Sequence, residues 1–117
     1  MSKAAVSVLV FGIYMVILGL IMLVFPNQLL SLFAYPTTTE VWIRILGFIV
    51  AVLGYYYLVA ARYELKPFFW ASVYGRPVVI VVFAGLVLLR LAEPTLVLFG
   101  AIDLLGAIWT AWALRSS

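Results

Sequence analysis

Four long apolar stretches divide the chain, and short breaks that contain polar residues and prolines separate them. The stretches run over Ala4–Phe25, Val41–Ala61, Phe68–Leu89 and Thr95–Leu114. A helix needs about 20 predominantly apolar residues to cross a hydrocarbon core of roughly 30 Å, and each stretch is about that long. The pattern predicts an all-α polytopic membrane protein in which residues 1–117 form one domain of four transmembrane helices.

The breaks predict how the helices are connected. Residues 62–67 and 90–94 are short enough for tight hairpins, which favours an up-down four-helix bundle. Residues 26–33 are amphipathic and predict a short interfacial helix after the first span, with Leu29, Leu30 and Phe33 toward lipid. Thr37 and Glu40 have the spacing of a capping box that would open the second span.

The basic residues predict the orientation of the chain in the membrane. Four of them fall on the side that holds both termini, namely Lys3, Arg62, Lys66 and Arg115. The other side has Arg90, with Arg44 just inside the second span. Because cytoplasmic segments are enriched in Lys and Arg, we expect both termini in the cytoplasm, with the protein in a bacterial inner membrane.

Composition narrows the functional classes. The chain is 68% hydrophobic and 9% charged, and its net charge of +3 comes from residues mostly at helix ends, so nucleic acid is not an expected partner. It has no Cys and no His, which excludes zinc, haem and thiol sites that use these residues. No phosphate-binding loop or nucleophile elbow is present. We expect no enzyme, no metal and no cofactor.

Polar and small residues in the spans predict a polar interior. The second span has one face that is charged at its outer end and small in the middle: Glu40, Arg44, Gly47, Ala51, Gly54 and Tyr55. The fourth span has a matching face: Gly100, Asp103, Gly106, Ala107 and Thr110. Ionisable groups at membrane depth usually face the bundle interior, and small residues let helices approach closely.

Depth arithmetic brings several of these groups together. At 1.5 Å per residue, Arg76 and Asp103 each lie about 12 Å from opposite ends of a roughly 30 Å span, so about 6 Å separates their depths. Tyr14 falls at nearly the same depth. We hypothesise a network of Arg76, Asp103, Arg44 and Glu40, with hydroxyls from Tyr14 and Tyr55. Such a network either fixes helix register or binds or conducts a polar species.

One motif resembles a known family. Arg44-Ile45-Leu46-Gly47 followed by Gly54 resembles the Arg-x-x-Gly then Gly pattern of the DoxX-like four-helix bacterial membrane proteins, and the whole-chain layout is similar. The resemblance implies a bundle of four spans and an accessory or uncharacterised membrane subunit, with no defined activity.

Two functions remain in competition. The first is a non-catalytic membrane protein that serves as an accessory subunit or binds a lipid or quinone among its helices. The second is an oligomeric small transporter or channel that uses Arg76 and Asp103. The expected partners are the bilayer and either another membrane protein or a second copy. The Gly12/Gly19 face of the first span could pack within the chain or against that copy.

Overall fold

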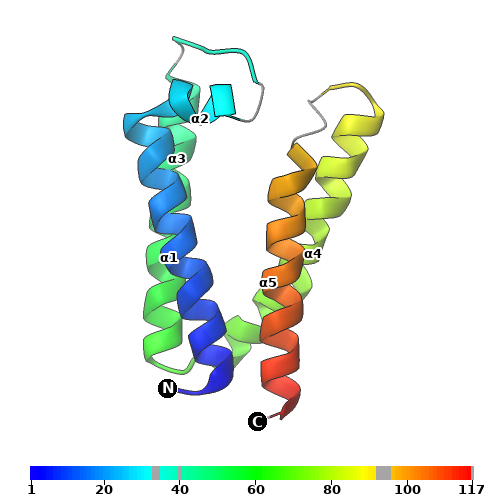
Figure 1. The fold of residues 1–117 in the computed structure, drawn as a ribbon. Coiled ribbons are helices and arrows are strands. Elements are labelled where there is room, and N and C mark those ends of the chain that lie inside the picture. Colours follow the sequence, from blue (N-terminus) through cyan, green and yellow to red (C-terminus); the bar gives the residue numbers. More distant parts are fainter. Residues whose placement is uncertain (33–34, 40, 92–95, 117) are drawn as a thin grey trace.

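The described chain is helical, with four long helices and one short one. The structure is a computed structural model, and it describes residues 1–32, 35–39, 41–91 and 96–116. Its helices are α1 (Lys3–Val24), α2 (Pro26–Leu32), α3 (Trp42–Arg62), α4 (Lys66–Leu88) and α5 (Leu96–Ser116) (Figure 1). The four long helices are long and apolar enough to cross a membrane, and the predicted helical class is confirmed.

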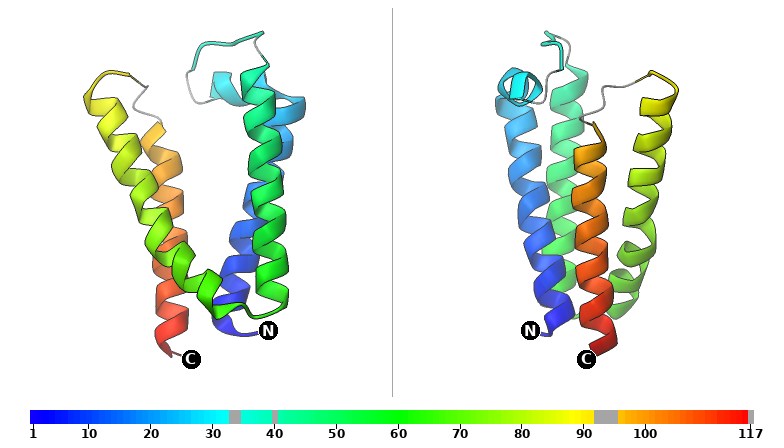
Figure 2. Two further views of the ribbon diagram at one scale, coloured as in Figure 1. Left: turned by 180° about the vertical axis from the view of Figure 1, so that it is seen from behind. Right: turned by 45° about the vertical axis from the view of Figure 1, so that its right-hand side comes forward.

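The long helices form two hairpins. Neighbouring long helices run in opposite directions, and both termini lie at the same end of the molecule (Figure 1). Helix α1 packs against α3, α4 packs against α5, and the two pairs meet mainly through α1 and α5. The pairs approach each other near the termini and diverge toward the end that holds α2 (Figure 2).

Glycines set the close contact between α1 and α3. A Cβ on Gly19 would lie 2.5 Å from the carbonyl oxygen of Gly47, and one on Gly54 would lie 2.8 Å from the carbonyl oxygen of Gly12. These distances leave no room for a side chain, so the backbones of the two helices touch directly. The Gly12/Gly19 face therefore packs within the chain.

The connection between α1 and α3 differs from the predicted one. Helix α3 begins at Trp42 after Val41, with no side-chain cap, so Thr37 lies too far upstream to cap it. Glu40, the other half of the predicted capping box, lies outside the described residues. Leu30 of α2 is buried against Met22 and Ile43, so it does not face lipid as expected. Phe33 also lies outside the described residues, and the interfacial position of α2 stays a prediction.

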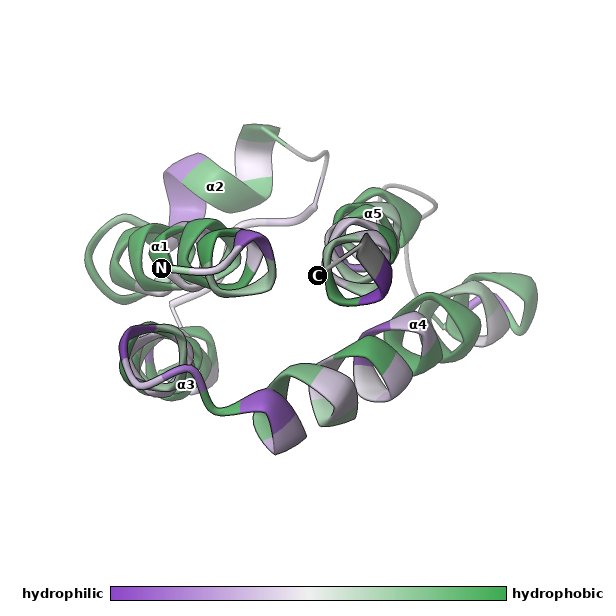
Figure 3. Ribbon diagram, turned by 90° about the horizontal axis from the view of Figure 1, so that it is seen from below, coloured by the Kyte–Doolittle hydropathy of each residue, from purple (hydrophilic) through white to green (hydrophobic). Residues whose placement is uncertain are grey.

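The outer surface is apolar along the long helices. Figure 3 shows hydrophobic residues along each of them. Val81 of α4 and Leu105 of α5, for example, are 69% and 66% exposed. Soluble proteins rarely expose a contiguous apolar surface of this extent to water. A bilayer would cover such a surface, as four candidate spans require.

Candidate functional site

Arg76 of α4 lies buried where the two hairpins meet. It is 4% exposed, and Nη2 donates hydrogen bonds to Ser72 Oγ at 3.1 Å and Thr110 Oγ1 at 3.0 Å. Its Nε donates to the Ser72 carbonyl oxygen at 3.3 Å. Ser72 lies four residues before Arg76, which is one helical turn, and long helical side chains point back toward that turn. The spacing of four residues within α4 therefore places Ser72 against the Arg76 side chain.

Two hydroxyls link this arginine to the other hairpin. Ser7 Oγ of α1 lies 2.8 Å from Thr110 Oγ1 of α5. Ser7 Oγ also lies 2.7 Å from the Ala4 carbonyl oxygen, and Thr110 Oγ1 lies 3.0 Å from the Gly106 carbonyl oxygen. Because each hydroxyl has one proton, one of them donates to its own helix while the other donates across the pair. Both hydroxyls are fully buried. One chain of hydrogen bonds thus connects α1, α5 and α4.

Aromatic rings cover the guanidinium. Its Cζ lies 4.4 Å from the ring centroid of Phe11 and 5.8 Å from that of Tyr57. The two rings are 5.6 Å apart in a tilted arrangement. Cation–π contacts of this kind stabilise a charge that has lost its water. We call these residues the Arg76 cluster: Ser7, Phe11, Tyr57, Ser72, Arg76 and Thr110.

One nitrogen of the cluster has no partner. Arg76 Nη1 is buried and makes no hydrogen bond. A Cβ on Gly106 would lie 2.9 Å from Nη1 and 3.0 Å from Phe11 Cδ2, so the nitrogen, this glycine and the phenyl ring meet at one place. A buried donor without an acceptor is costly, and more so when it is charged.

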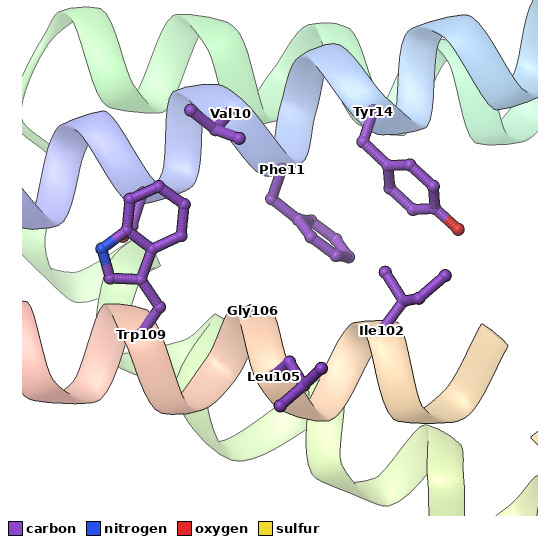
Figure 4. Close-up of a pocket in the computed structure, with 8 residues that line it drawn as sticks. Val10, Phe11, Tyr14, Ile102, Leu105, Gly106 and Trp109 are labelled. Carbon is purple, nitrogen blue, oxygen red and sulfur yellow. The ribbon is translucent and has the colours of Figure 1, made fainter. Parts of the chain in front are cut away.

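A cavity of about 300 Å³ adjoins the cluster between α1 and α5, and it is open at the surface, where the lining residues Val10 and Leu105 are 45% and 66% exposed. Figure 4 shows side chains from both helices pointing into this space. The lining is mostly apolar and consists of Ser7, Val10, Phe11, Tyr14, Ile102, Leu105, Gly106 and Trp109. Two of these residues, Ser7 and Phe11, belong to the Arg76 cluster, and Gly106 lies beside it. Residues that lie beside the unpartnered nitrogen Nη1 therefore also line the cavity.

The structure places Arg76, Asp103 and Tyr14 near one another. Asp103 interacts electrostatically with Arg76 and with Tyr14, and Tyr14 lines the cavity. The hydrogen bonds of Arg76 all go to Ser72 and Thr110, however, and none reaches Asp103. Asp103 therefore acts on the arginine through space and makes no direct pair with it.

The other predicted members of the network lie elsewhere. Arg44 is exposed, and its Nη1 donates to the Leu23 carbonyl at 2.6 Å, at the end of α1 near α2. Tyr55 is 59% exposed and lies beside Tyr56. Glu40 falls outside the described residues. The structure therefore does not join Arg44 or Tyr55 to Arg76, because Arg44 bonds to the end of α1 and the Tyr55 side chain is exposed.

Sequence reasoning missed Ser7 and Ser72. Both are small hydroxyl residues in apolar helices, where they often satisfy themselves on the preceding turn, as each does here. The available signal was spacing. Ser72 precedes Arg76 by four residues, and Ser7 precedes Phe11 by four, so each shares a helix face with a member of the cluster.

The cluster and the cavity together contain the kinds of group that proteins use to hold a ligand. It offers one free charged donor, two aromatic faces and an apolar cavity, while metal ligands do not gather in the described part of the chain. No protein-family model, curated protein or solved structure matches the chain. Its function is therefore inferred from its own residues and their arrangement.

Proposed function

We propose that this chain is a non-catalytic integral membrane protein that binds a hydrophobic ligand, a lipid or a quinone, between α1 and α5. The observation that carries the proposal is the mostly apolar cavity of about 300 Å³ beside the buried Arg76 cluster. Ligand pockets typically combine an apolar lining with a few placed polar groups, and this volume is at the small end of their range.

The same features suit an accessory subunit of a larger membrane assembly. A protein of this kind would hold its ligand for a partner, which agrees with the resemblance of Arg44–Gly47 and Gly54 to DoxX-like proteins. The partner would be another membrane protein or a second copy of the chain.

For the membrane, we propose one up-down bundle in a bacterial inner membrane with both termini in the cytoplasm. Both termini, the α3–α4 turn and four basic residues lie at one end of the helices: Lys3, Arg62, Lys66 and Arg115. Cytoplasmic segments favour such charges. At the opposite end, α2 would lie along the interface with Gln28 and Ser31, both exposed, toward water.

Filling the cavity tests the binding proposal. Val10 lines the cavity on α1, and Val10→Trp would occupy part of its volume. We expect the purified variant to lose its co-purified amphiphile, measured by liquid chromatography and mass spectrometry of a solvent extract. Ile17→Trp adds the same ring to α1 at a 54% exposed position outside the cavity, and it should retain the ligand.

Equal ligand content in the two variants would contradict the proposal. So would a wild-type protein whose extract matches the surrounding bilayer in composition. Circular dichroism on both variants establishes that each is helical, so loss of ligand cannot be attributed to loss of fold.

A second candidate function is an oligomeric transporter or channel. It is favoured by Asp103, a carboxylate within a span that interacts electrostatically with Arg76. Because ionisable groups at membrane depth often mark transport paths, Asp103→Asn should abolish flux in proteoliposomes while the melting temperature is maintained. A variant that merely unfolds would favour a structural role for this carboxylate.

A further inference from the structure

We infer that the ligand is a single-chain amphiphile with an acidic head, a carboxylate or a phosphate, and that this head binds Arg76 Nη1. The inference rests on the proposed binding function and specifies its ligand. The cavity of about 300 Å³ sets the size of the ligand, and the guanidinium sets the chemistry of its head.

Charge is the first reason to expect an acid. An arginine side chain keeps its positive charge in proteins. The groups that touch this one are neutral: the Ser72 carbonyl and hydroxyl, the Thr110 hydroxyl and two aromatic rings. Asp103 interacts with this charge through space and makes no hydrogen bond to it. A buried charge without a counter-ion in contact is costly in a low-dielectric site. An acidic head supplies both a negative charge in contact and the missing acceptor, whereas a quinone carbonyl supplies only the acceptor.

Geometry gives the second reason. Nη1 meets Gly106 and the Phe11 ring, and both of these residues also line the cavity. Gly106 has no side chain to block the approach, and the Phe11 ring covers the guanidinium with its centroid 4.4 Å from Cζ. Figure 4 shows the Phe11 ring pointing into the space between α1 and α5, so rotation of this ring would open the guanidinium beneath it to a ligand in the cavity.

Depth gives the third reason. Ser72 lies six residues from the start of α4 and Thr110 six residues from the end of α5, so the guanidinium sits about 9 Å from the end that holds the termini. A charged head is far less costly there than at the bilayer centre. The cavity continues along α1 as far as Tyr14, about 16 Å deep, where an alkyl chain would lie.

Three probes with the same 18-carbon tail test the head group. Full-length protein in phosphatidylcholine nanodiscs is titrated with oleate, with oleoyl lysophosphatidate and with oleyl alcohol, and binding is measured by native mass spectrometry. Wild type should bind one or both acids about tenfold to hundredfold more tightly than the alcohol, as charge-assisted hydrogen bonds predict. The acid that binds more tightly identifies the head.

Two variants assign the binding to Nη1. Arg76→Gln removes the charge, and Gly106→Ala places a methyl group 2.9 Å from Nη1 while keeping the arginine. Both should lower acid affinity to that of the alcohol. Gly85→Ala, on α4 with open space around its Cβ, should bind as wild type does. Gly106→Ala keeps the test decisive if Arg76→Gln does not fold.

The outcomes separate this inference from the function on which it rests. Equal binding of acids and alcohol by wild type, or unchanged acid binding by folded Gly106→Ala and Arg76→Gln, overturns the acidic head and leaves the hydrophobic site standing. Failure of all three probes to bind folded wild type overturns both.

Discussion

Arg76 shows how a charged side chain is accommodated in an apolar helix. Its guanidinium is satisfied on one edge by Ser72 on its own helix and by Thr110 on a neighbouring one, and on its face by Phe11. Each contact comes from a different helix, so the arginine joins α1, α4 and α5. The nitrogen that remains unpartnered is the one beside the cavity.

Removing the Thr110 hydroxyl should weaken the contact that Arg76 makes among α1, α4 and α5. Thr110→Val keeps the shape of the side chain but leaves Ser7 and Arg76 Nη2 without their shared partner. Hydrogen bonds within membranes contribute modestly, so we expect a loss of about 0.5–2 kcal/mol in the free energy of unfolding. Thr110→Ser keeps the hydroxyl and is the control. Denaturant unfolding in mixed micelles measures both, and equal losses in the two variants would rule out the hydrogen bond as the cause.

Residue positions could be predicted only as far as helical geometry determines them. The depths of Arg76, Asp103 and Tyr14 follow from the rise per residue, and Asp103 interacts electrostatically with each of the other two. The sequence pattern predicts Tyr55 on the face of Gly54, but adjacent residues are about 100° apart around a helix, and the Tyr55 side chain is exposed. Arg44 finds an acceptor at the end of α1, which depends on tertiary structure that spacing does not contain.

At the scale of elements, glycines hold α1 against α3. The predicted small-residue face of the second span is the face that packs, with Gly47 against Gly19 and Gly54 against Gly12. The sequence pattern identified the face correctly but not its partner, because contacts within a chain and between copies use the same small residues.

An alanine at this contact should therefore be destabilising. In Gly19→Ala the new methyl group would meet backbone atoms at 2.5 Å, so the helices must separate, at a cost of about 1–3 kcal/mol. In Gly85→Ala the methyl group meets open space, and the gain in helix propensity should stabilise the protein by up to about 1 kcal/mol. Thermal unfolding in detergent compares the two, and a Gly85→Ala variant as unstable as Gly19→Ala would refute the assigned contact.

A second contact between elements joins the N-terminus to the α3–α4 turn. The carboxylate of Glu64 accepts a hydrogen bond from the Ser2 amide at 3.0 Å, and the Ser2 hydroxyl caps α1 by accepting from the Ala5 amide. Hydrogen bonds from the Ser2 hydroxyl and amide lower the pKa of Glu64 below its ordinary value of 4.5.

This contact should be lost in acid. A carboxyl group whose pKa is lowered by folding stabilises the fold above its unfolded pKa and ceases to do so as the pH falls through its folded pKa. The melting temperature of wild type should therefore exceed that of Glu64→Gln at pH 7, and the difference should shrink below about pH 4. A difference that stays constant over this range would show that the charge of Glu64 has no part in the contact.

At the scale of the whole molecule, hydropathy predicted the class and the spans. The observed long helices begin and end within two residues of the predicted stretches wherever both ends are described. This agreement has a physical cause, since each stretch must match the thickness of a bilayer. The meeting of the two hairpins through α1 and α5 could not be predicted in the same way, because it depends on side-chain packing among four similar apolar surfaces.

The proposed orientation can be measured by cysteine labelling, because the native chain has no Cys. Tyr63 follows the end of α3 and Leu91 comes after the end of α4, two helix ends that lie at opposite ends of the molecule (Figure 1). The two residues are 66% and 72% exposed. In right-side-out vesicles, an impermeant maleimide should label Leu91→Cys and spare Tyr63→Cys until the membrane is opened. The reverse pattern would place both termini outside the cell.

The proposed function depends on a defined amphiphile in the cavity between α1 and α5. Native mass spectrometry of wild-type protein released from nanodiscs can detect that molecule, because one spectrum reports copy number and retained small molecules. We expect one molecule of defined mass per chain, retained at collision energies that remove bulk lipid. A bare chain under those conditions, whether monomer or oligomer, would contradict the proposal.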